Sequence, residues 1–396
     1  MESLDLFLFG LAIFIFSGWC FNTFIHLLSI FYAKWKLHKQ HSETETKDLP
    51  GISILKPLVG IDPNLFENLE SFFTMKYPSF ELLFCIQDEM DASRMIVQSL
   101  INKYPAVDAK MFLGGKNVGI NPKVNNIAIG YEAAKYDLIL ISDSGIKMSE
   151  DTLVDMATHM TQKVGLVHQM PYACPRRGLH SSFEKVYFGS QHAKMYLSAD
   201  ILRINCATGM SCLMRKAVLD EAGGMKEFGQ YLAEDFFMAQ AFIDRGWRVK
   251  MCSRLAQQNS GTYSITHLQQ RLCRWMKLRN AMVPATIFWE PISLCFTLGL
   301  MNAWAVSYML DLSPMSYLLV HTLLWFLLDY TLIKVLENGA VPFSKIDFLV
   351  CWCLNEFSYP FLILQSHWDP KIHWRGRNFK LKWGGVVEEL YTKQTV

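Results

Sequence analysis

The sequence has little net charge and lacks several common catalytic motifs. Its 38 Lys and Arg residues nearly balance 36 Asp and Glu residues, and a net charge of +2 excludes a strong field directed at nucleic acid. There is no GxGxxG motif and no GxxxxGKS/T motif, so dinucleotide-dependent oxidoreductases and P-loop enzymes lose their main support. A GxSxG motif is also missing, which argues against an α/β-hydrolase.

Closely spaced cysteines are also missing. The 10 cysteines are scattered, and the nearest pair, Cys351 and Cys353, has one residue between its members. The sequence has no CxxC pair and no disulfide framework. It also lacks the spacing of His, Cys and acidic residues that is typical of a zinc site. We expect reduced thiols in a protein that faces the cytosol.

Charge is absent from a long N-terminal run. No Asp, Glu, Lys or Arg lies between Leu6 and Ala33, which exceeds the ~20 residues that a spanning helix needs. Lysines follow this run, and none precedes it. The positive-inside rule then predicts a membrane anchor over 1–33 with the following residues in the cytosol. A cleaved signal peptide is the alternative, although its basic residues would precede the apolar run.

A second apolar block covers residues 287–367. It divides into three candidate membrane segments that each carry an acid, namely 287–310 with Glu290, 314–336 with Asp329 and 346–366 with Glu356. Glu356 is central in its segment and requires a partner if that segment spans. Three crossings would place the basic tail, 368–396, outside the cytosol, against the charge rule. We therefore expect that one segment is re-entrant or interfacial.

The middle of the chain alternates strand and helix patterns. Polar residues over 34–50 predict a linker, and residues 51–262 then read as a single domain. Apolar runs predict strands, and helical spacing predicts the helices between them. Asn121 followed by Pro122 predicts a helix start. The strands are expected at 52–58, 80–89, 109–115, 136–145 and 164–170, and the helices at 63–75, 92–103, 121–135 and 150–162. This order predicts an α/β fold with a mostly parallel sheet and helices on both faces.

Two of these strands end in acids. Asp88 and Asp91 follow one strand, and Asp143 follows another. Ligands of such sheets bind beyond the carboxyl ends of the strands, so these acids are candidates for a binding site. Asp also ends strands because it favours turns, and that structural explanation stays open.

A pair of acids lies in the stretch YLAEDFF. Asp235 begins an expected helix over 236–243, where the helix dipole stabilises an acid by ~0.3–1 kcal/mol. Dipole stabilisation explains one acid but not Glu234 beside it. Two adjacent, poorly solvated acids raise each other's pKa, and such a carboxylate can accept a proton as a general base. The role of Glu234 stays open.

A basic helix is expected over 266–280, within a predicted interface segment at 263–286. It carries Arg271, Arg274, Lys277 and Arg279 around an apolar face. One interpretation is an amphipathic helix on the membrane surface. The other is a cationic clamp for a phosphate leaving group, because Arg offers a planar bidentate fork. The two roles are compatible.

These motifs together resemble a known family. The chain has acids at successive strand ends, followed by AEDFF and then by RLCRW at 271–275. This order resembles the signature of the GT-A fold inverting glycosyltransferases, which is three Asp motifs followed by Q/RxxRW. The closer resemblance is to the ceramide glucosyltransferases, glycosyltransferase family 21, which is similar to family 2. It runs over nearly the whole chain. The segments that carry it are ISILKPLVGIDPNL, VGINPKVNN, ATGMSCLMRKAVL, AEDFFMAQA, QNSGTYSI and HWDPKIHWRGR.

The resemblance implies roles for individual residues. Asp91 matches the first Asp motif, with Asp88 beside the nucleotide base, and Asp143 matches the second, at the diphosphate and metal end. Asp235 matches the third and would be the general base. The residues that would hold the diphosphate and line the acceptor site are Arg271, Arg274 and Trp275, and the residues that the family associates with its active site are His192 and Cys206.

The resemblance also implies an activity. The chain is expected to transfer glucose from UDP-glucose to the primary hydroxyl of ceramide with inversion, at a Golgi or early secretory membrane, with its catalytic domain in the cytosol. Mg2+ or Mn2+ is an expected cofactor, although DSG at Asp143 replaces the usual DxD and provides one carboxylate instead of two. A processive polysaccharide synthase, another lipid-linked sugar transferase and a nucleotide-binding membrane scaffold are the alternatives.

Overall fold

The computed structural model describes residues 2–39, 48–261 and 264–390, so most of the predicted linker, 40–47, lies outside the described residues. The chain forms two compact units. The α/β unit comprises Lys36–Cys174, Ala199–Tyr263 and Lys371–Val396. The helical unit comprises Met1–Trp35, Pro175–Ser198 and Ser264–Pro370. The domain boundaries expected from the sequence stay predictions.

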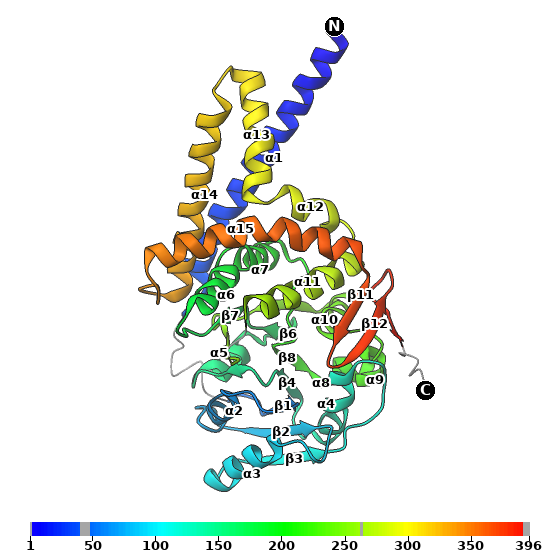
Figure 1. Cartoon of the computed structure of the whole chain (residues 1–396). Coiled ribbons are helices and arrows are strands. Elements are labelled where there is room, and N and C mark those ends of the chain that lie inside the picture. The colour runs from blue at the N-terminus through cyan, green and yellow to red at the C-terminus, as the bar shows by residue number, and fades with distance from the viewer. Residues whose placement is uncertain (1, 40–47, 262–263, 391–396) are drawn as a thin grey trace, which may run out of the picture. The chain divides into compact units, whose positions relative to one another are not determined.

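A seven-stranded sheet forms the centre of the α/β unit (Figure 1). Its strand order is β3-β2-β1-β4-β8-β6-β9, and β8 alone among these seven strands runs antiparallel to its neighbours. This mostly parallel sheet confirms the predicted fold class. The strands are β1 (Ile52–Leu58), β2 (Phe80–Ile86), β3 (Ala109–Leu113), β4 (Leu138–Ser142), β6 (Val164–His168), β8 (Ser211–Arg215) and β9 (Arg248–Met251).

Helices cover both faces of this sheet. Successive strand residues point to opposite faces, so Ile54 joins one buried core and Leu55 joins the other. The first core includes residues of α2 (Leu65–Phe73), α3 (Ser93–Lys103) and α5 (Thr152–His159). The second core includes residues of α4 (Pro122–Ala133), α8 (Lys216–Glu221), α9 (Gly224–Phe228) and α10 (Glu234–Asp244).

The predicted helix start at Asn121 is confirmed. The Asn121 side chain accepts hydrogen bonds from the backbone N–H groups of Lys123 and Val124, and Pro122 occupies the first turn. Further along α4, a Cβ on Gly130 would lie 2.6 Å from the Cys85 Sγ, so glycine allows this helix to approach the sheet closely. The N-terminal end of α4 is thereby fixed at the carboxyl edge of the sheet.

Two smaller sheets complete the α/β unit. One contains β5 (Ile146–Lys147), β10 (Ala256–Gln258) and β7 (Pro171–Ala173). The other is the C-terminal sheet, which contains β11 (Lys371–Trp374), β12 (Arg377–Leu381) and β13 (Val387–Leu390). The sequence analysis describes this tail by its charge and by the family resemblance of HWDPKIHWRGR, and it predicts no strands there. In the structure it forms an antiparallel sheet that belongs to the same unit as β1.

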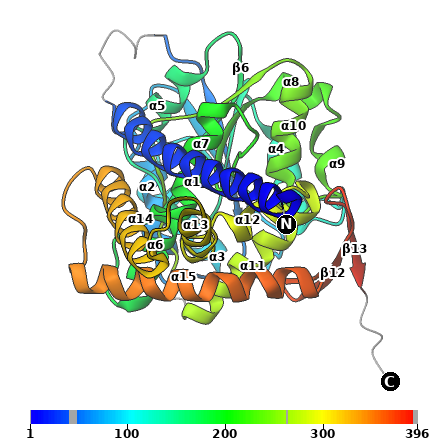
Figure 2. The same cartoon turned by 90° about the horizontal axis from the view of Figure 1, so that it is seen from above.

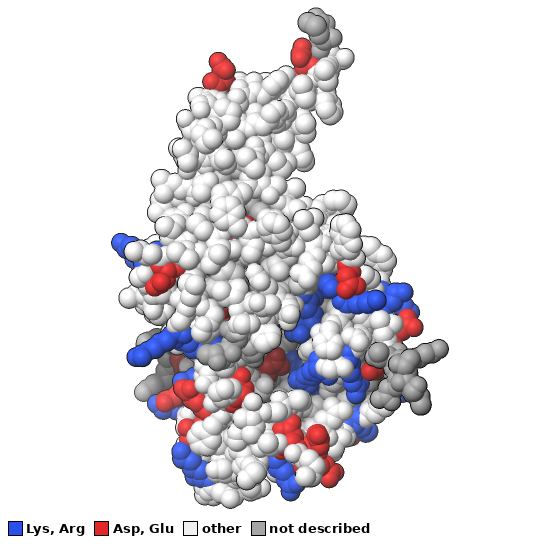
Figure 3. Space-filling view, in the orientation of Figure 1, with Lys and Arg blue, Asp and Glu red and all other residues white. Residues whose placement is uncertain are grey.

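The helical unit contains the candidate membrane helices. Three helices are long and apolar enough to cross a membrane, namely α1 (Glu2–Lys36), α14 (Pro314–Glu337) and α15 (Lys345–Trp368). In the space-filling view, the surface around α1, α13 and α14 is almost free of charge, apart from acids at its far end (Figure 3). The other helices of this unit are α6 (Leu179–Gly189), most of α7 (Gln191–Leu202), α11 (Ile265–Met282), α12 (Thr286–Ile292) and α13 (Cys295–Leu310).

The candidate membrane segment 287–310 is not one continuous helix. This stretch forms α12 and α13, which are bent by 73° relative to each other. Pro291 lies inside α12, where it lacks the N–H that would continue the helical hydrogen bonds, and Leu294 has an extended backbone with φ −68° and ψ 144°. If the bent pair counts as one span, the described residues contain four candidates.

The predicted partner of Glu356 belongs to a buried histidine–acid cluster in the helical unit, made of His26, Lys194, Asp329, Trp352 and Glu356. The Asp329 carboxylate accepts a hydrogen bond of 2.9 Å from Trp352 Nε1 and lies 3.3 Å from His26 Nε2. The charges that act on the Lys194 ammonium include both Asp329 and Glu356. Lys194, from α7, is therefore a cation whose charge acts on Glu356, the acid for which the sequence predicts a partner if its segment spans.

Candidate active site

The acids after β2 stabilise turns. Asp88 is exposed, and one of its oxygens accepts a 2.9 Å hydrogen bond from the backbone N–H of Met90. Asp91 accepts hydrogen bonds from the N–H groups of Gly60 at 2.7 Å and Ser93 at 2.8 Å. Partial burial opposes ionisation of Asp91, but these hydrogen bonds outweigh it and lower the pKa of the carboxyl. Asp91 thus joins the turn after β1 to the start of α3.

Asp143 lies at the end of β4, next to two buried lysines. Its carboxylate is 2.9 Å from Lys123 Nζ, and its backbone carbonyl accepts a 2.6 Å hydrogen bond from Lys56 Nζ. Lys56 is fully buried, and its ammonium lies 3.8 Å from the centre of the Phe72 ring. Burial lowers the pKa of Lys56 to about 7, and the charge of Asp143 opposes that shift.

Lys123 connects the second and third acidic motifs. Its ammonium is 2.9 Å from the Asp143 carboxylate and 2.9 Å from the Glu234 carboxylate. Asn121 Nδ2 donates a further hydrogen bond of 2.9 Å to Glu234. Burial opposes the charge on Lys123, but Asp143 and Glu234 outweigh it and raise the pKa of the ammonium. Glu234 is therefore a buried partner of Lys123 and Asn121 and is not a solvated acid.

Asp235 lies beside this ion pair but has different partners. It stands in the first turn of α10, and its carboxylate accepts hydrogen bonds from the N–H groups of Gly209 and Phe236. Burial, followed by the charge of Glu234, raises the pKa of Asp235 to about 6. The carboxylate is thus ionised at neutral pH and holds a proton more strongly than an ordinary Asp.

The approach of Asp235 depends on Gly209. A Cβ on Gly209 would lie 3.1 Å from Asp235 Oδ2 and 3.0 Å from Lys123 Nζ. The Gly209 carbonyl also accepts a 2.9 Å hydrogen bond from Lys123 Nζ. The loop before β8 thereby joins Asp235 to the lysine that pairs with Asp143. We call Lys56, Lys123, Asp143, Glu234 and Asp235 the acid–lysine cluster.

Cys206 lies in the loop that carries Gly209. It precedes Gly209 by three residues, and its side chain is partly exposed. The structure thus places Cys206 on a segment that reaches the acid–lysine cluster.

The other predicted residues lie in the helical unit. His192, on α7, is buried, and its ring stacks on Trp275 with 6.0 Å between the ring centres. The Arg271 guanidinium lies 4.5 Å from the centre of the Trp275 ring. Arg274 is partly buried on the same helix, α11. Burial, then the charges of Arg279 and Arg271, lowers the pKa of His192 to about 3, so the ring is neutral.

The sequence analysis does not identify two residues of the cluster as site residues, and it leaves the role of a third undecided. Lys56 and Lys123 were missed, and Glu234 was left open. A lysine inside the mostly apolar strand ISILKPL was a readable signal, because an unpaired charge does not stay in a buried strand. Nothing in the sequence shows that Lys123 pairs with Glu234, which is 111 residues away.

The donor set does not match a resident metal ion. No group of three or more His, Cys, Asp or Glu side chains suited to a metal occurs within residues 2–39, 48–261 and 264–390. One Asp143 oxygen already contacts Lys123, and both Glu234 oxygens contact Lys123 or Asn121. A Mg2+ or Mn2+ ion would have to take most of its ligands from substrate phosphates and water.

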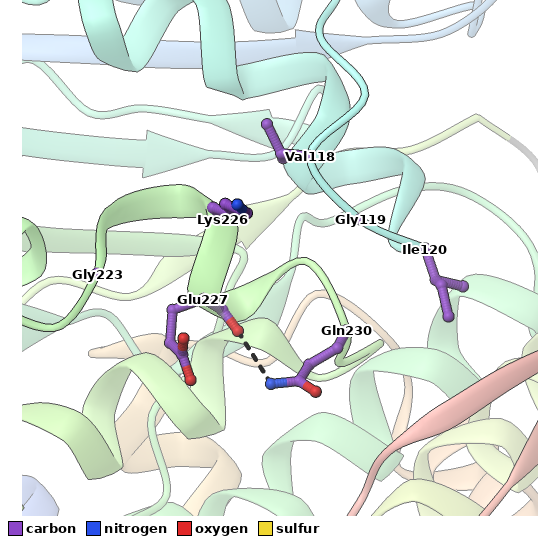
Figure 4. A pocket seen from close by; sticks show the side chains of 7 residues that line it. All are labelled: Val118, Gly119, Ile120, Gly223, Lys226, Glu227 and Gln230. Atoms are coloured by element: carbon purple, nitrogen blue, oxygen red, sulfur yellow. Dashed lines mark hydrogen bonds between the residues drawn. The ribbon is translucent and has the colours of Figure 1, made fainter.

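A separate cavity of about 470 Å³ lies beside the cluster in the α/β unit. Figure 4 shows its lining residues, in which the Gln230 side chain donates a hydrogen bond of 3.3 Å to the Glu227 carbonyl. The lining residues are Val118, Gly119, Ile120, Gly223, Lys226, Glu227 and Gln230. None of the site residues predicted from the sequence lines this cavity, so we do not assign the reaction to it.

The mostly parallel sheet, the acids at its carboxyl edge and the terminal apolar helices define a membrane-associated α/β transferase of the GT-A class. The chain belongs to glycosyl transferase family 21, whose model matches residues 21–387.

Curated relatives match most of the chain. Ceramide glucosyltransferase 3 of Caenorhabditis elegans is 44% identical over 92% of this chain and 79% of the relative. Ceramide glucosyltransferase 1 of the same organism is 41% identical over 98% and 84%. Among solved structures, the mannosyltransferase PcManGT of Pyrobaculum calidifontis, in complex with GDP-Man and Mn2+, is 15% identical with a TM-score of 0.49, over 91% of this chain and 96% of that one.

Proposed function

We propose that this chain transfers glucose from UDP-glucose to the primary hydroxyl of ceramide, with inversion at the anomeric carbon. The membership of family 21 and the names of the relatives support the substrates. The observation that carries the chemistry is Asp235, a carboxylate whose pKa of about 6 suits a general base at neutral pH.

In the proposed reaction, Asp235 accepts the proton of the ceramide hydroxyl. The hydroxyl oxygen attacks the anomeric carbon, the bond from that carbon to the diphosphate oxygen breaks, and UDP leaves on the opposite face. The hydrogen bonds from Gly209 and Phe236 fix the position of the carboxylate. Pre-positioned groups of this kind reduce the reorganisation that the transition state requires.

The remaining residues take roles around this step. We propose that Asp88 and Asp91 bind the nucleotide base, and that Arg271 and Arg274 bind the diphosphate. We assign Trp275, stacked on the neutral His192, to the acceptor side, and Cys206 to the lining of the site. A Mg2+ or Mn2+ ion belongs to the proposal only as one carried by the diphosphate, with Asp143 as its protein carboxylate.

We also propose a membrane topology with the α/β unit in the cytosol. Lys36 onward and the C-terminal sheet belong to the same unit, so an even number of crossings must separate them. The candidates between them are three, namely the bent pair α12–α13, the helix α14 and the helix α15. Two of these candidates therefore cross the membrane, and one lies in the membrane interface. We assign the interfacial position to α15, which runs crosswise to α13 and α14 in both views (Figures 1 and 2). Tags at the two ends of the chain should then differ in protease access in sealed vesicles.

The membrane itself is proposed to be that of the Golgi or the early secretory pathway. This location fits a lipid acceptor that stays in the bilayer and a sugar donor that is soluble in the cytosol. Imaging of the tagged chain beside organelle markers tests it.

The decisive test of function uses the purified full-length chain. It is incubated with ceramide and either UDP-glucose or UDP-galactose, and the products are analysed by mass spectrometry and NMR. We expect one hexose per ceramide, a preference for UDP-glucose and an inverted anomeric configuration. A polymer product would favour a processive synthase, and an absence of lipid-stimulated UDP release would favour a nucleotide-binding scaffold.

A further inference from the structure

The C-terminal sheet contains an unusual turn. Trp374 pairs with Arg377 across the β11–β12 hairpin, so Arg375 and Gly376 alone form its tip. Both have positive φ, 50° at Arg375 and 73° at Gly376, as a two-residue hairpin turn requires. Asn, Asp and Gly adopt this backbone most readily, so an arginine at the first position is strained. The strain suggests that the guanidinium has a function at this tip.

The hairpin tip lies close enough to the acid–lysine cluster for the charges of the cluster to act on Arg375. The charges that act on the Arg375 guanidinium are those of Asp143 and Glu234, and all three residues belong to the α/β unit. At the other end of the C-terminal sheet, Val386 forms a β-bridge with Tyr231, three residues before Glu234. The segment that leads into α10 is thereby fastened to the sheet that carries Arg375.

Arg375 is available to a ligand. Its side chain is exposed, and its guanidinium lies 5.2 Å from the centre of the neighbouring Trp374 ring. No hydrogen bond or ion pair joins it to any other described residue. The two lysines of the cluster, Lys56 and Lys123, are in contrast buried and already bonded to other members of the cluster. Arg375 is thus a cation of this unit that can still form new bonds.

The charge of the cluster calls for such a cation. The cluster contains three carboxylates and two lysines, so it is negative when all five groups are ionised. A diphosphate placed at the exposed edge of Asp143 would be repelled by this excess of acid. A guanidinium offset from the acids compensates for it and offers two parallel N–H groups to phosphate oxygens.

We propose that Arg375 binds the diphosphate of the nucleotide-sugar, so that the β11–β12 hairpin forms part of the donor site. This inference rests on the proposed function, because it takes a nucleoside diphosphate as the ligand. It adds a residue from the last segment of the chain to the diphosphate contacts proposed for Arg271 and Arg274.

The test compares UDP with uridine, which lacks the diphosphate. Dissociation constants are measured by calorimetry on the full-length chain in detergent. Loss of a charge-assisted contact predicts that Arg375→Ala weakens UDP binding about 10- to 100-fold and leaves uridine binding within about twofold. Arg375→Lys keeps the charge but loses the bidentate fork, so it should fall between Arg375→Ala and the wild type.

Arg377→Ala is the matched control. Arg377 lies two residues further along the same hairpin, where its guanidinium is 3.7 Å from the Glu389 carboxylate. Its UDP affinity should stay within about twofold of the wild type, because exposed ion pairs contribute little. Thermal unfolding of each variant checks that the fold is retained, and Arg375→Lys serves if Arg375→Ala does not fold.

Three results would contradict the proposal. They are unchanged UDP binding in Arg375→Ala, an equal loss for uridine and UDP, and an equal effect of Arg377→Ala. A wild-type chain that binds no UDP would instead refute the proposed function itself, which separates the two failures.

Discussion

Both units of this chain bury ionisable groups, but in different ways. In the acid–lysine cluster, Glu234 and Lys123 pair at 2.9 Å, and Asn121 occupies the second carboxylate oxygen. In the histidine–acid cluster, Glu356 Oε2 and both ring nitrogens of His26 have no hydrogen-bond partner among the described residues. The first cluster reaches solvent through Asp143, whose side chain is 41% exposed.

This difference fits the roles that we propose, with chemistry in the first cluster and helix assembly in the second. A general base must be reached by substrate, and the acid–lysine cluster lies at the ligand edge of a sheet. The histidine–acid cluster joins α1, α7, α14 and α15, and polar contacts between apolar helices serve to hold such helices together. We therefore expect changes in the first cluster to affect turnover and changes in the second to affect stability modestly.

The largest expected effect is that of Asp235→Asn. The amide cannot accept the hydroxyl proton, so transfer should fall about 100- to 10,000-fold. UDP binding should stay close to the wild type. The melting temperature should fall modestly, because the N–H groups of Gly209 and Phe236 bond to different oxygens of Asp235 and the Asn side chain has only one acceptor oxygen. Turnover is measured by glucosylceramide formation. If turnover is retained, Asp235 is not the general base. The proposed contrast between a cluster that affects turnover and a cluster that affects stability would then be wrong.

The next effect is that of Lys123→Met on stability. This change leaves Glu234 buried without its cation, and breaking a buried ion pair costs roughly 3–5 kcal/mol in the free energy of unfolding. Lys116→Met is the control, because the Lys116–Glu132 pair is exposed and contributes at most about 1 kcal/mol. Denaturant unfolding of both variants measures the free energy of unfolding. Equal losses in the two variants would show that the Lys123–Glu234 pair stabilises the fold no more than a surface ion pair does.

Glu234→Gln tests the electrostatic coupling within the acid pair. The Glu234 carboxylate raises the pKa of Asp235, and Asp235 must be deprotonated to act as base. Wild-type kcat should therefore rise with pH around a midpoint of about 6. In Glu234→Gln that midpoint should move to lower pH, because a neutral amide no longer opposes ionisation of Asp235. A midpoint that stays in place, with turnover retained, would refute this coupling.

The smallest effects are expected in the histidine–acid cluster. Glu356→Gln leaves Lys194 with Asp329 as its acid and removes the repulsion between the Asp329 and Glu356 carboxylates, so we expect only a small change in the free energy of unfolding. Asp329→Asn keeps an acceptor for Trp352 and should cost about 1 kcal/mol. Both variants should keep specific activity within about twofold. A loss of activity on the scale of Asp235→Asn, without unfolding, would make this cluster part of the reaction.

Local signals in the sequence identify much of this structure. The apolar run at 52–58 and the Asn121–Pro122 pair predict β1 and the start of α4, because strand burial and helix capping depend on neighbouring residues. Asp143 and Asp235 are found because strand ends and helix starts are also local. The pairing of Lys123 with both acidic motifs depends on the completed fold, so spacing along the chain does not reveal it.

The tail and the third apolar block show where local reading fails. Over 287–310, mean hydropathy conceals the break that Pro291 and Leu294 introduce. In the tail, six basic residues direct attention to charge and away from the strand–turn–strand pattern around Arg375 and Gly376. In the sequence, a glycine after an arginine is only a weak turn signal, and the positive φ of both residues is known only from the structure. The β-bridge from Val386 to Tyr231 is likewise visible only in the structure.

The shared unit of the N-terminal strands and the C-terminal sheet has a consequence for biogenesis. The α/β unit begins at Lys36, but its last strand, β13, ends at Leu390. Synthesis runs from the N-terminus, so the ribosome must deliver every membrane helix before this unit can close. The α/β unit therefore becomes complete only after the membrane helices have been made, and a chain that ends before β13 would contain every membrane helix but an unfinished α/β unit.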